Sequence, residues 1–136
     1  MDWMLRDLAD SVPLTRHVVV LSVDGLRMAH HGPDNDTADR LAAACAGLQS
    51  LSGAIALEFP GDGGRMRMVV IEVEGGFFYL MAAGANAYLA VLADEGVDAG
   101  LMGGRMRDLV ARIGAHLSSP SRMEHTASGS ARILAR

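Results

Sequence analysis

The segment from Thr37 to Leu57 constrains the fold most, because it is typical of one long helix built largely from small residues. Alanine, glycine and serine leave one side of this helix almost without bulk, and a separate side carries an apolar ridge of Leu41, Leu48, Leu51 and Ile55. A helix with two such sides needs two partners that bury them. One partner is the chain's own sheet, and the simplest second partner is the same helix of another copy. The segment therefore indicates an assembly surface rather than an active site.

The composition limits what fills the core. The chain has 136 residues, enough for one domain with a substantial core. Half of the residues are hydrophobic, but only 4% are aromatic and 9 are methionine, so small and flexible side chains must fill the interior. All 12 basic residues are arginine, which excludes any mechanism that depends on a lysine.

The charge distribution argues against nucleic acid as a partner. Residues 1–117 hold nine Arg and fifteen acidic residues, whereas a phosphate-binding surface needs clustered cations. The single Cys45 excludes an intrachain disulfide and fits a reducing compartment. The sequence has no secretory signal and no apolar run near the roughly 20 residues that cross a bilayer. We expect a cytoplasmic protein without direct membrane insertion; recruitment to a membrane by a partner stays open.

The N-terminal part predicts a short helix and a β-hairpin. The helix covers Trp3–Val12, with Asp2 as its cap and Pro13 as its stop. The hairpin strands are His17–Ser22 and Leu26–His30, joined through an Asp-Gly pair that is a strong turn signal. Pro33 and two aspartates then open the long helix, where the helix dipole favours carboxylates.

The C-terminal part predicts three strands and a helix. The strands Met66–Glu74, Phe77–Ala83 and Ala87–Ala93 are joined by glycine-containing turns so short that the strands must form an antiparallel meander. Several strands are almost continuously apolar, which indicates a sheet covered on both faces. The last helix covers Asp98–Leu117, and its first turns are weakened by up to about 1 kcal/mol for each of Gly100, Gly103 and Gly104, so we expect it to fray or begin late.

The predicted order α-β-β-α-β-β-β-α gives an α+β sandwich, a five-stranded antiparallel sheet with helices on both faces. With this order, Val20–Leu26 in the hairpin and Gly47–Leu51 in the long helix resemble the roadblock/dynein light chain family. The likeness is greatest to the small actinomycete members that conservon operons encode beside a sensor kinase-like protein and a small Ras-like GTPase. The resemblance covers residues 1–117 and implies a profilin-like fold. Residues 118–136, rich in Ser, Gly, Ala and Arg, are expected to form a disordered tail.

The resemblance implies a non-catalytic homodimer that binds and regulates a small Ras-like GTPase. Two copies would join Met66–Glu74 edge to edge and lay their long helices side by side, and the GTPase would dock on the helix pair. We expect no catalytic residue, cofactor or metal. The predicted dimer and partner positions are Arg40, Ala43, Ala44, Gly47, Leu48, Ser50, Leu51, Ser52, Ala54, Arg67, Val69, Ile71 and Val73.

Nucleophilic and metal chemistry find weak support in the residues. Cys45 lies among alanines and is best interpreted as a small packing residue. A triad of His17, Ser22 and Asp24 would have to converge within one hairpin, which is rare. The pair His30-His31 beside two aspartates suggests a metal site, but adjacent residues of a strand point to opposite faces.

Three further patterns have a structural interpretation. Glu72 and Glu74 share one face of a strand and are expected to form a polar strip at a sheet edge rather than an acid–base pair. The loop Gly61–Gly64 lacks the strand-to-helix setting of a phosphate loop. Arg65 and Arg67 are the most mobile candidates for an arginine that acts on a GTPase, although solvated charge is the simpler interpretation for both.

Two other functions stay open at this level. A small-molecule sensor of PAS, GAF or profilin type needs a cavity with convergent polar groups, for which Tyr79, Tyr88 and Asn86 are the suggestive residues. A purely structural adaptor for a sensor kinase is the second alternative.

Overall fold

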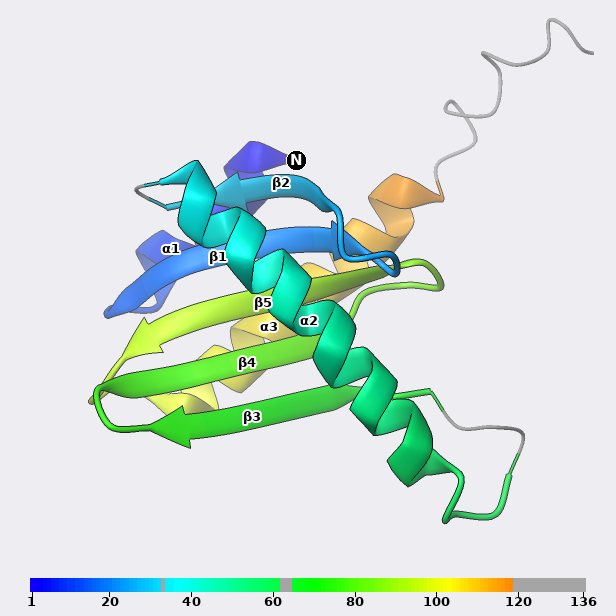
Figure 1. Cartoon of the computed structure of the whole chain (residues 1–136). Coiled ribbons are helices and arrows are strands. Elements are labelled where there is room, and N and C mark those ends of the chain that lie inside the picture. The colour runs from blue at the N-terminus through cyan, green and yellow to red at the C-terminus, as the bar shows by residue number, and fades with distance from the viewer. Residues whose placement is uncertain (33, 62–64, 119–136) are drawn as a thin grey trace, which may run out of the picture.

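A computed structural model of the chain describes residues 1–32, 34–61 and 65–118. Three helices and five strands follow one another in the predicted order (Figure 1). Their bounds are α1 Asp2–Ser11, β1 Thr15–Ser22, β2 Arg27–His31, α2 Asn35–Ala56, β3 Met68–Val73, β4 Gly76–Ala82, β5 Ala87–Asp94 and α3 Ala99–Leu117. The predicted bounds differ from these by at most two residues at any end. Pro33, most of the Gly61–Gly64 loop and residues 119–136 lie outside the described residues.

The strands form one antiparallel sheet in the order β2-β1-β5-β4-β3. The first hairpin and the three-stranded meander are both confirmed, and they meet where β1 pairs with β5. This order puts the most apolar strands in the middle and leaves β2 and β3 at the two edges. The predicted five-stranded α+β sandwich is therefore correct.

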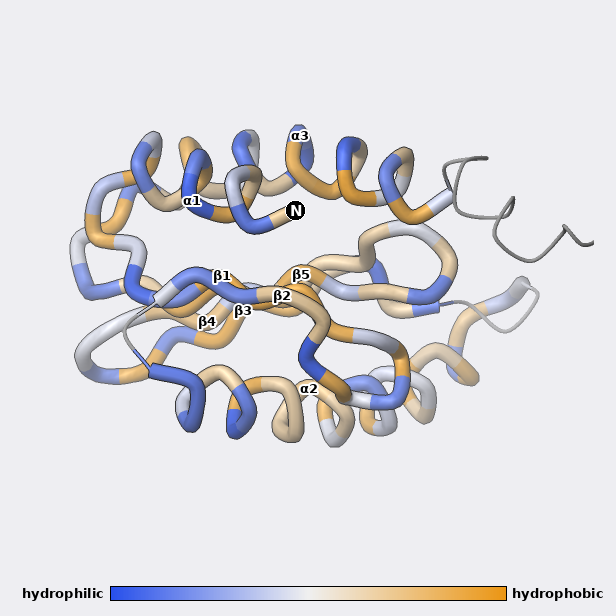
Figure 2. The backbone as a smooth tube through the Cα atoms, turned by 90° about the horizontal axis from the view of Figure 1, so that it is seen from above, coloured by the Kyte–Doolittle hydropathy of each residue, from blue (hydrophilic) through white to orange (hydrophobic). Residues whose placement is uncertain are grey.

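Helices cover the sheet in two layers. Figure 2 shows α1 and α3 together on one side of the sheet and α2 alone on the other. Side chains that alternate along β1 divide between two core clusters, with Val18 and Val20 facing α1 and α3, and Val19 and Leu21 facing α2. The double covering that the continuous apolar runs predict is present over β1, β5 and β4.

The long helix α2 begins two residues earlier than expected. Asp34 is its N-cap, and its carboxylate accepts a hydrogen bond from the Thr37 backbone N–H at 2.6 Å. The small residues Ala38, Ala42 and Cys45 are buried against the chain's own sheet. Part of the small-residue pattern therefore serves close contact with the sheet and is not available to a second copy.

Two local predictions about helix ends are wrong. Asp2 is the first residue of α1 rather than its cap; the N-cap is Met1, which makes no side-chain capping bond. Helix α3 does not begin late but starts at Ala99, where the Asp98 carboxylate caps the first turn by accepting the Leu101 backbone N–H at 3.0 Å. Buried packing of Met102 and Met106 outweighs the unfavourable propensity of the glycines. No helix among the described residues has the length and apolarity needed to cross a membrane.

Candidate interface along α2 and β3

The outer edge of β3 is open. Strand β3 pairs with β4 on one side and with no other strand among the described residues. Its apolar side chains are poorly covered, with Val70 49% and Val73 61% exposed. An apolar edge strand of this kind is a ready template for pairing with another chain.

The end of α2 extends beyond the sheet (Figure 1). Figure 1 shows that α2 crosses the sheet diagonally and extends past the β3 edge. Its overhanging end and the residues that follow expose four large apolar side chains, namely Leu51, Ile55, Leu57 and Phe59, at 61–77%. We call this segment, residues 51–59, the overhang.

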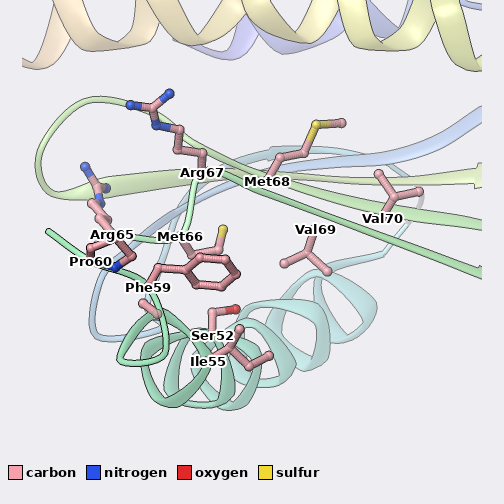
Figure 3. Close-up of a pocket in the computed structure, with 11 residues that line it drawn as sticks. Ser52, Ile55, Phe59, Pro60, Arg65, Met66, Arg67, Met68, Val69 and Val70 are labelled. Carbon is pink, nitrogen blue, oxygen red and sulfur yellow. The ribbon is translucent and has the colours of Figure 1, made fainter. Parts of the chain in front are cut away.

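A slot separates the overhang from the β3 edge. Its volume is about 560 Å³, and it lies between the end of α2 with the following turn and residues 65–70. Figure 3 shows Val69 pointing from β3 toward Ser52 and Ile55 of the overhang, while Met68 and Val70 point to the other side of the strand. The slot therefore follows the open edge of the sheet and has an apolar helix along one side.

An apolar hollow lies on the other side of α2, over the sheet. Its volume is about 660 Å³. Ile71, Phe78 and Leu92 lie in its lining and are register partners across β3, β4 and β5, so they form one row across the sheet. The wall belongs to α2 and consists of Leu41, Ala44, Gly47, Leu48, Ser50 and Leu51. The hollow thus has the chemistry of an interface core.

The thirteen predicted interface positions fall into three groups. Those in the hollow are Ala44, Gly47, Leu48, Ser50, Leu51 and Ile71. Those in the slot are Ser52, Arg67 and Val69. The third group lines neither cavity and is exposed to solvent; it consists of Arg40, Ala43, Ala54 and Val73. The structure thus brings nine of the positions to two cavities along one helix and one strand.

Sequence reasoning missed several lining residues. Phe78 and Leu92 line the hollow and Phe59 lines the slot, but none was predicted as a site position. For Phe59 a signal exists, because apolar residues continue past the expected helix end with nothing in the local pattern to bury them. For Phe78 and Leu92 there is none, since their exposure depends on the diagonal course of α2.

Arg65 is held in place, contrary to the prediction of a mobile arginine. Its guanidinium donates to the carbonyl oxygens of Gly84 and Ala87 and lies 3.4 Å from the Tyr88 hydroxyl, with its carbon 5.0 Å from the Tyr88 ring centre. These contacts fasten the start of the β3 segment to the β4–β5 turn. Arg67 is exposed at the slot.

The nucleophilic constellations do not assemble. Burial raises the pKa of the Cys45 thiol to about 12, so this thiol stays protonated at neutral pH. His17 lies near the start of β1 and Ser22 at its end, too far apart along an extended strand to form a triad. Among the described residues, no three His, Cys, Asp or Glu side chains gather as a metal site would require.

The three polar residues suggested for a ligand cavity, Tyr79, Tyr88 and Asn86, do not converge on one site. Tyr79 belongs to the core cluster under α1 and α3, and Tyr88 belongs to the cluster under α2, so the two hydroxyls lie on opposite faces of the sheet. Asn86 is exposed in the turn between β4 and β5. Glu72 and Glu74 are exposed at and beyond the end of the β3 edge, as a polar strip requires.

Together, the layered sheet, the open β3 edge and the overhanging helix define a small sandwich of profilin-like architecture. The sequence pattern of the Roadblock/LC7 domain matches residues 1–93. The chain is also similar to a Roadblock/LC7 domain of known structure from Streptomyces avermitilis, with 40% identity over 86% of this chain and 97% of that one and a TM-score of 0.80. The chain therefore belongs to the Roadblock/LC7 family.

More distant structures share the fold. The gliding protein MglB from Thermus thermophilus aligns with 22% identity over 82% of this chain and 84% of that one, with a TM-score of 0.74. Profilin IB from Acanthamoeba castellanii aligns with 14% identity over 76% of this chain and 87% of that one, with a TM-score of 0.52. None of the curated proteins compared with the chain matches it significantly. The predicted family and the profilin-like architecture are confirmed.

Proposed function

We propose that the chain is a non-catalytic homodimeric scaffold that binds and regulates a small Ras-like GTPase. Residues 1–117 form the domain that carries this function, and residues 118–136 are a tail outside it. The observation that carries the proposal is a reciprocal pair of apolar features. One molecule presents both an overhang of exposed apolar side chains and an apolar hollow over the sheet.

A two-fold axis beside β3 matches these two features. The overhang lies across the slot from the first residues of β3. The hollow is lined by Ile71, a later residue of β3, and by the neighbouring Phe78. When two β3 edges pair antiparallel, the start of one strand lies opposite the end of the other. In this arrangement the overhang of each copy lies next to the hollow of its partner. The pairing also turns two open edges into one ten-stranded sheet and removes an aggregation hazard.

The two α2 helices lie side by side in this dimer. Ala44 and Gly47 in the wall of the hollow leave room for close approach of the partner helix. The outward positions Arg40, Ala43 and Ala54 stay accessible on the same helix pair. The resemblance to the roadblock family points to this helix pair as the surface on which the GTPase docks.

The dimer is tested by a matched pair of charge substitutions. Phe59→Asp places a carboxylate in the overhang, and Leu26→Asp places one on the β1–β2 turn; the two native side chains are similarly exposed, at 69% and 67%. Multi-angle light scattering should give a dimer mass for the wild type and Leu26→Asp and a monomer mass for Phe59→Asp. A Phe59→Asp protein with the full dimer mass would overturn the proposed interface.

The partner is tested by adding a small Ras-like GTPase loaded with GTP or GDP to the wild-type chain. A gain in mass that depends on the bound nucleotide would support binding of the GTPase. If Arg40→Glu loses this gain but keeps the dimer mass, the result would support docking on the helix pair. A dimer that does not bind the GTPase in either nucleotide state would favour the alternative of a purely structural adaptor. A monomer that ignores it would favour the ligand-sensing alternative.

A further inference from the structure

The two edges of the sheet differ in their ability to accept another strand. Strand β2 is irregular, because its register with β1 shifts between Val20 and Leu21 and leaves Met28 outside the pairing. Next to this bulge, Arg27 forms an ion pair with Asp39 of α2 at 2.7 Å. A bulge and a charged side chain both discourage pairing at an edge, whereas the register of β3 with β4 is unbroken. Strand β3 is therefore the edge that can accept a further strand.

Hydrogen bonding to β4 determines which backbone groups of β3 face the open edge. The Ala82 N–H donates to the carbonyl oxygen of Arg67 at 2.9 Å, so these two residues form a hydrogen-bonded pair. In an antiparallel ladder such pairs recur at every second residue, so Val69, Ile71 and Val73 also direct their N–H and C=O groups toward β4. The residues between them direct these groups outward, and they are Met68, Val70 and Glu72.

This outward-facing set does not continue beyond either end of β3. The next position after its end would be Glu74, which lies in the turn between β3 and β4. The next position before its start would be Met66, whose side chain would have to lie on the same side of the sheet as that of Met68. Met66 packs instead with Val69 in the core cluster under α2, so the alternation breaks before β3 begins. The set is therefore centred on Val70.

We propose that two copies pair through β3 in the single register that sets Val70 opposite Val70 of the partner copy. This proposal rests on the homodimer of the proposed function and specifies its central contact. In a two-fold antiparallel pair, outward residues of one copy must lie opposite outward residues of the other. Only with Val70 on the axis does the whole set match itself, because Met68 then lies opposite Glu72. A shift by two residues in either direction would bring Met66 or Glu74, which lie outside the strand, into the ladder.

The side chains suit this register. Val69 and Ile71, both on the α2 side of the sheet, lie opposite each other at the more closely spaced positions between hydrogen-bonded pairs. On the other side, Val70, which is 49% exposed in one copy, packs against its counterpart. Glu72 lies opposite Met68 and about 14 Å along the strand from Glu72 of the partner copy, so the register opposes no like charges.

Disulfide formation in single-cysteine variants measures the register. Met68→Cys, Val70→Cys and Glu72→Cys each place one thiol on the same face of the edge, and the native Cys45 does not interfere because it is buried. Opposite residues of a hydrogen-bonded pair have Cα atoms about 5.5 Å apart, which a disulfide spans, whereas Cα atoms more than about 7 Å apart cannot be bridged. With oxidised glutathione as the oxidant, Val70→Cys should therefore give a covalently linked dimer.

The other two variants are matched controls. Met68→Cys and Glu72→Cys should stay unlinked when each is oxidised alone, because the two copies of the thiol are about 14 Å apart along the strands. An equimolar mixture of the two should give a linked heterodimer. Mass spectrometry identifies the linked residues in mixtures of each pair of variants. A main product that joins residues 68 and 70 would place Val69 on the axis, and one that joins residues 70 and 72 would place Ile71 there; either product would overturn the proposed register.

Light scattering separates failure of the register from failure of the dimer. A wild-type protein with a monomer mass at every concentration contradicts the proposed function itself, and the register with it. A Val70→Cys protein that keeps the dimer mass but stays unlinked contradicts the register alone.

Amide hydrogen exchange tests the same pairing without any cysteine. The outward amides, those of Met68, Val70 and Glu72, should be protected in the wild type and lose this protection in Phe59→Asp. The amides of residues 69 and 71 are the internal control, because they bond to β4 and should stay protected in both proteins. Equally fast exchange of the outward amides in a wild-type dimer and in Phe59→Asp would show that the edge is unpaired and would overturn the proposal.

Discussion

Substitution of Gly47 should separate the stability of the single domain from the stability of the proposed dimer. It lies in the middle of α2 and lines the hollow, and a Cβ built on it meets no atom within 4 Å. A Cβ atom added there therefore clashes with nothing within one copy. Replacement of a mid-helix glycine by leucine improves helix propensity by roughly 0.8 kcal/mol. Gly47→Leu should therefore stabilise the isolated domain.

The same substitution should weaken the dimer. In the proposed dimer the added side chain would fill space that the partner helix occupies, and overpacking of a close contact costs about 1–3 kcal/mol. That corresponds to roughly a 5- to 150-fold rise in the dimer Kd, and the two-fold axis places the substitution in both copies. The variant thus combines a more stable helix with a weaker assembly, two effects of opposite sign.

Light scattering over a dilution series and thermal unfolding measure the two effects. If the proposed dimer forms, the wild-type Tm should rise with protein concentration, and in Gly47→Leu this rise should be shifted to higher concentrations. Gly104→Leu is the matched control, because it lies on α3 and a Cβ there also meets no atom within 4 Å; it should stabilise the fold without changing the dimer Kd. An unchanged dimer Kd in Gly47→Leu would refute side-by-side packing of the helices at this residue.

Three further outcomes are expected. Cys45 should resist a thiol reagent at neutral pH while the chain is folded, because its pKa of about 12 keeps the buried thiol protonated, and it should react once denaturant unfolds the chain. Arg65→Ala should lower the free energy of unfolding by about 1–2 kcal/mol in a denaturant titration, whereas Arg67→Ala, which removes an exposed side chain, should change it by less than about 0.5 kcal/mol. Deletion of residues 119–136 should leave the Tm nearly unchanged, and a fall of many degrees would refute the interpretation of this segment as a tail.

Most of the fold follows from local patterns in the sequence. The Asp24-Gly25 pair predicts the first hairpin, and the short glycine turns predict the meander, because both depend on backbone conformations set within a few residues. The position of β3 at an edge is harder to predict, since it depends on β1 pairing with β5 across most of the chain length. The two misplaced features, the cap of α1 and the start of α3, arise where tertiary packing or a single side-chain bond outweighs propensity.

The candidate site is predictable only in part. The small-residue helix and the apolar strand predict the candidate surface, and nine of the predicted positions line the two cavities on it. The contacts of Arg65 were not predictable, because its acceptors are backbone carbonyls of a turn about twenty residues further along the chain. The burial of His17 was equally unpredictable, since it depends on the close approach of Gly32 to the ring in the folded chain.

The diagonal course of α2 gives its small residues two separate uses. All of its buried residues, Ala38, Ala42 and Cys45, lie in the first half, where short side chains bring the helix close to its own sheet. None of its residues from Gln49 onward is buried, although Leu51 and Ile55 are as apolar as any core residue. Substitutions in the first half should therefore act on folding and those in the second half on assembly. The exposure of Leu51 and Ile55 in the single copy is the structural reason to propose a second copy that covers them.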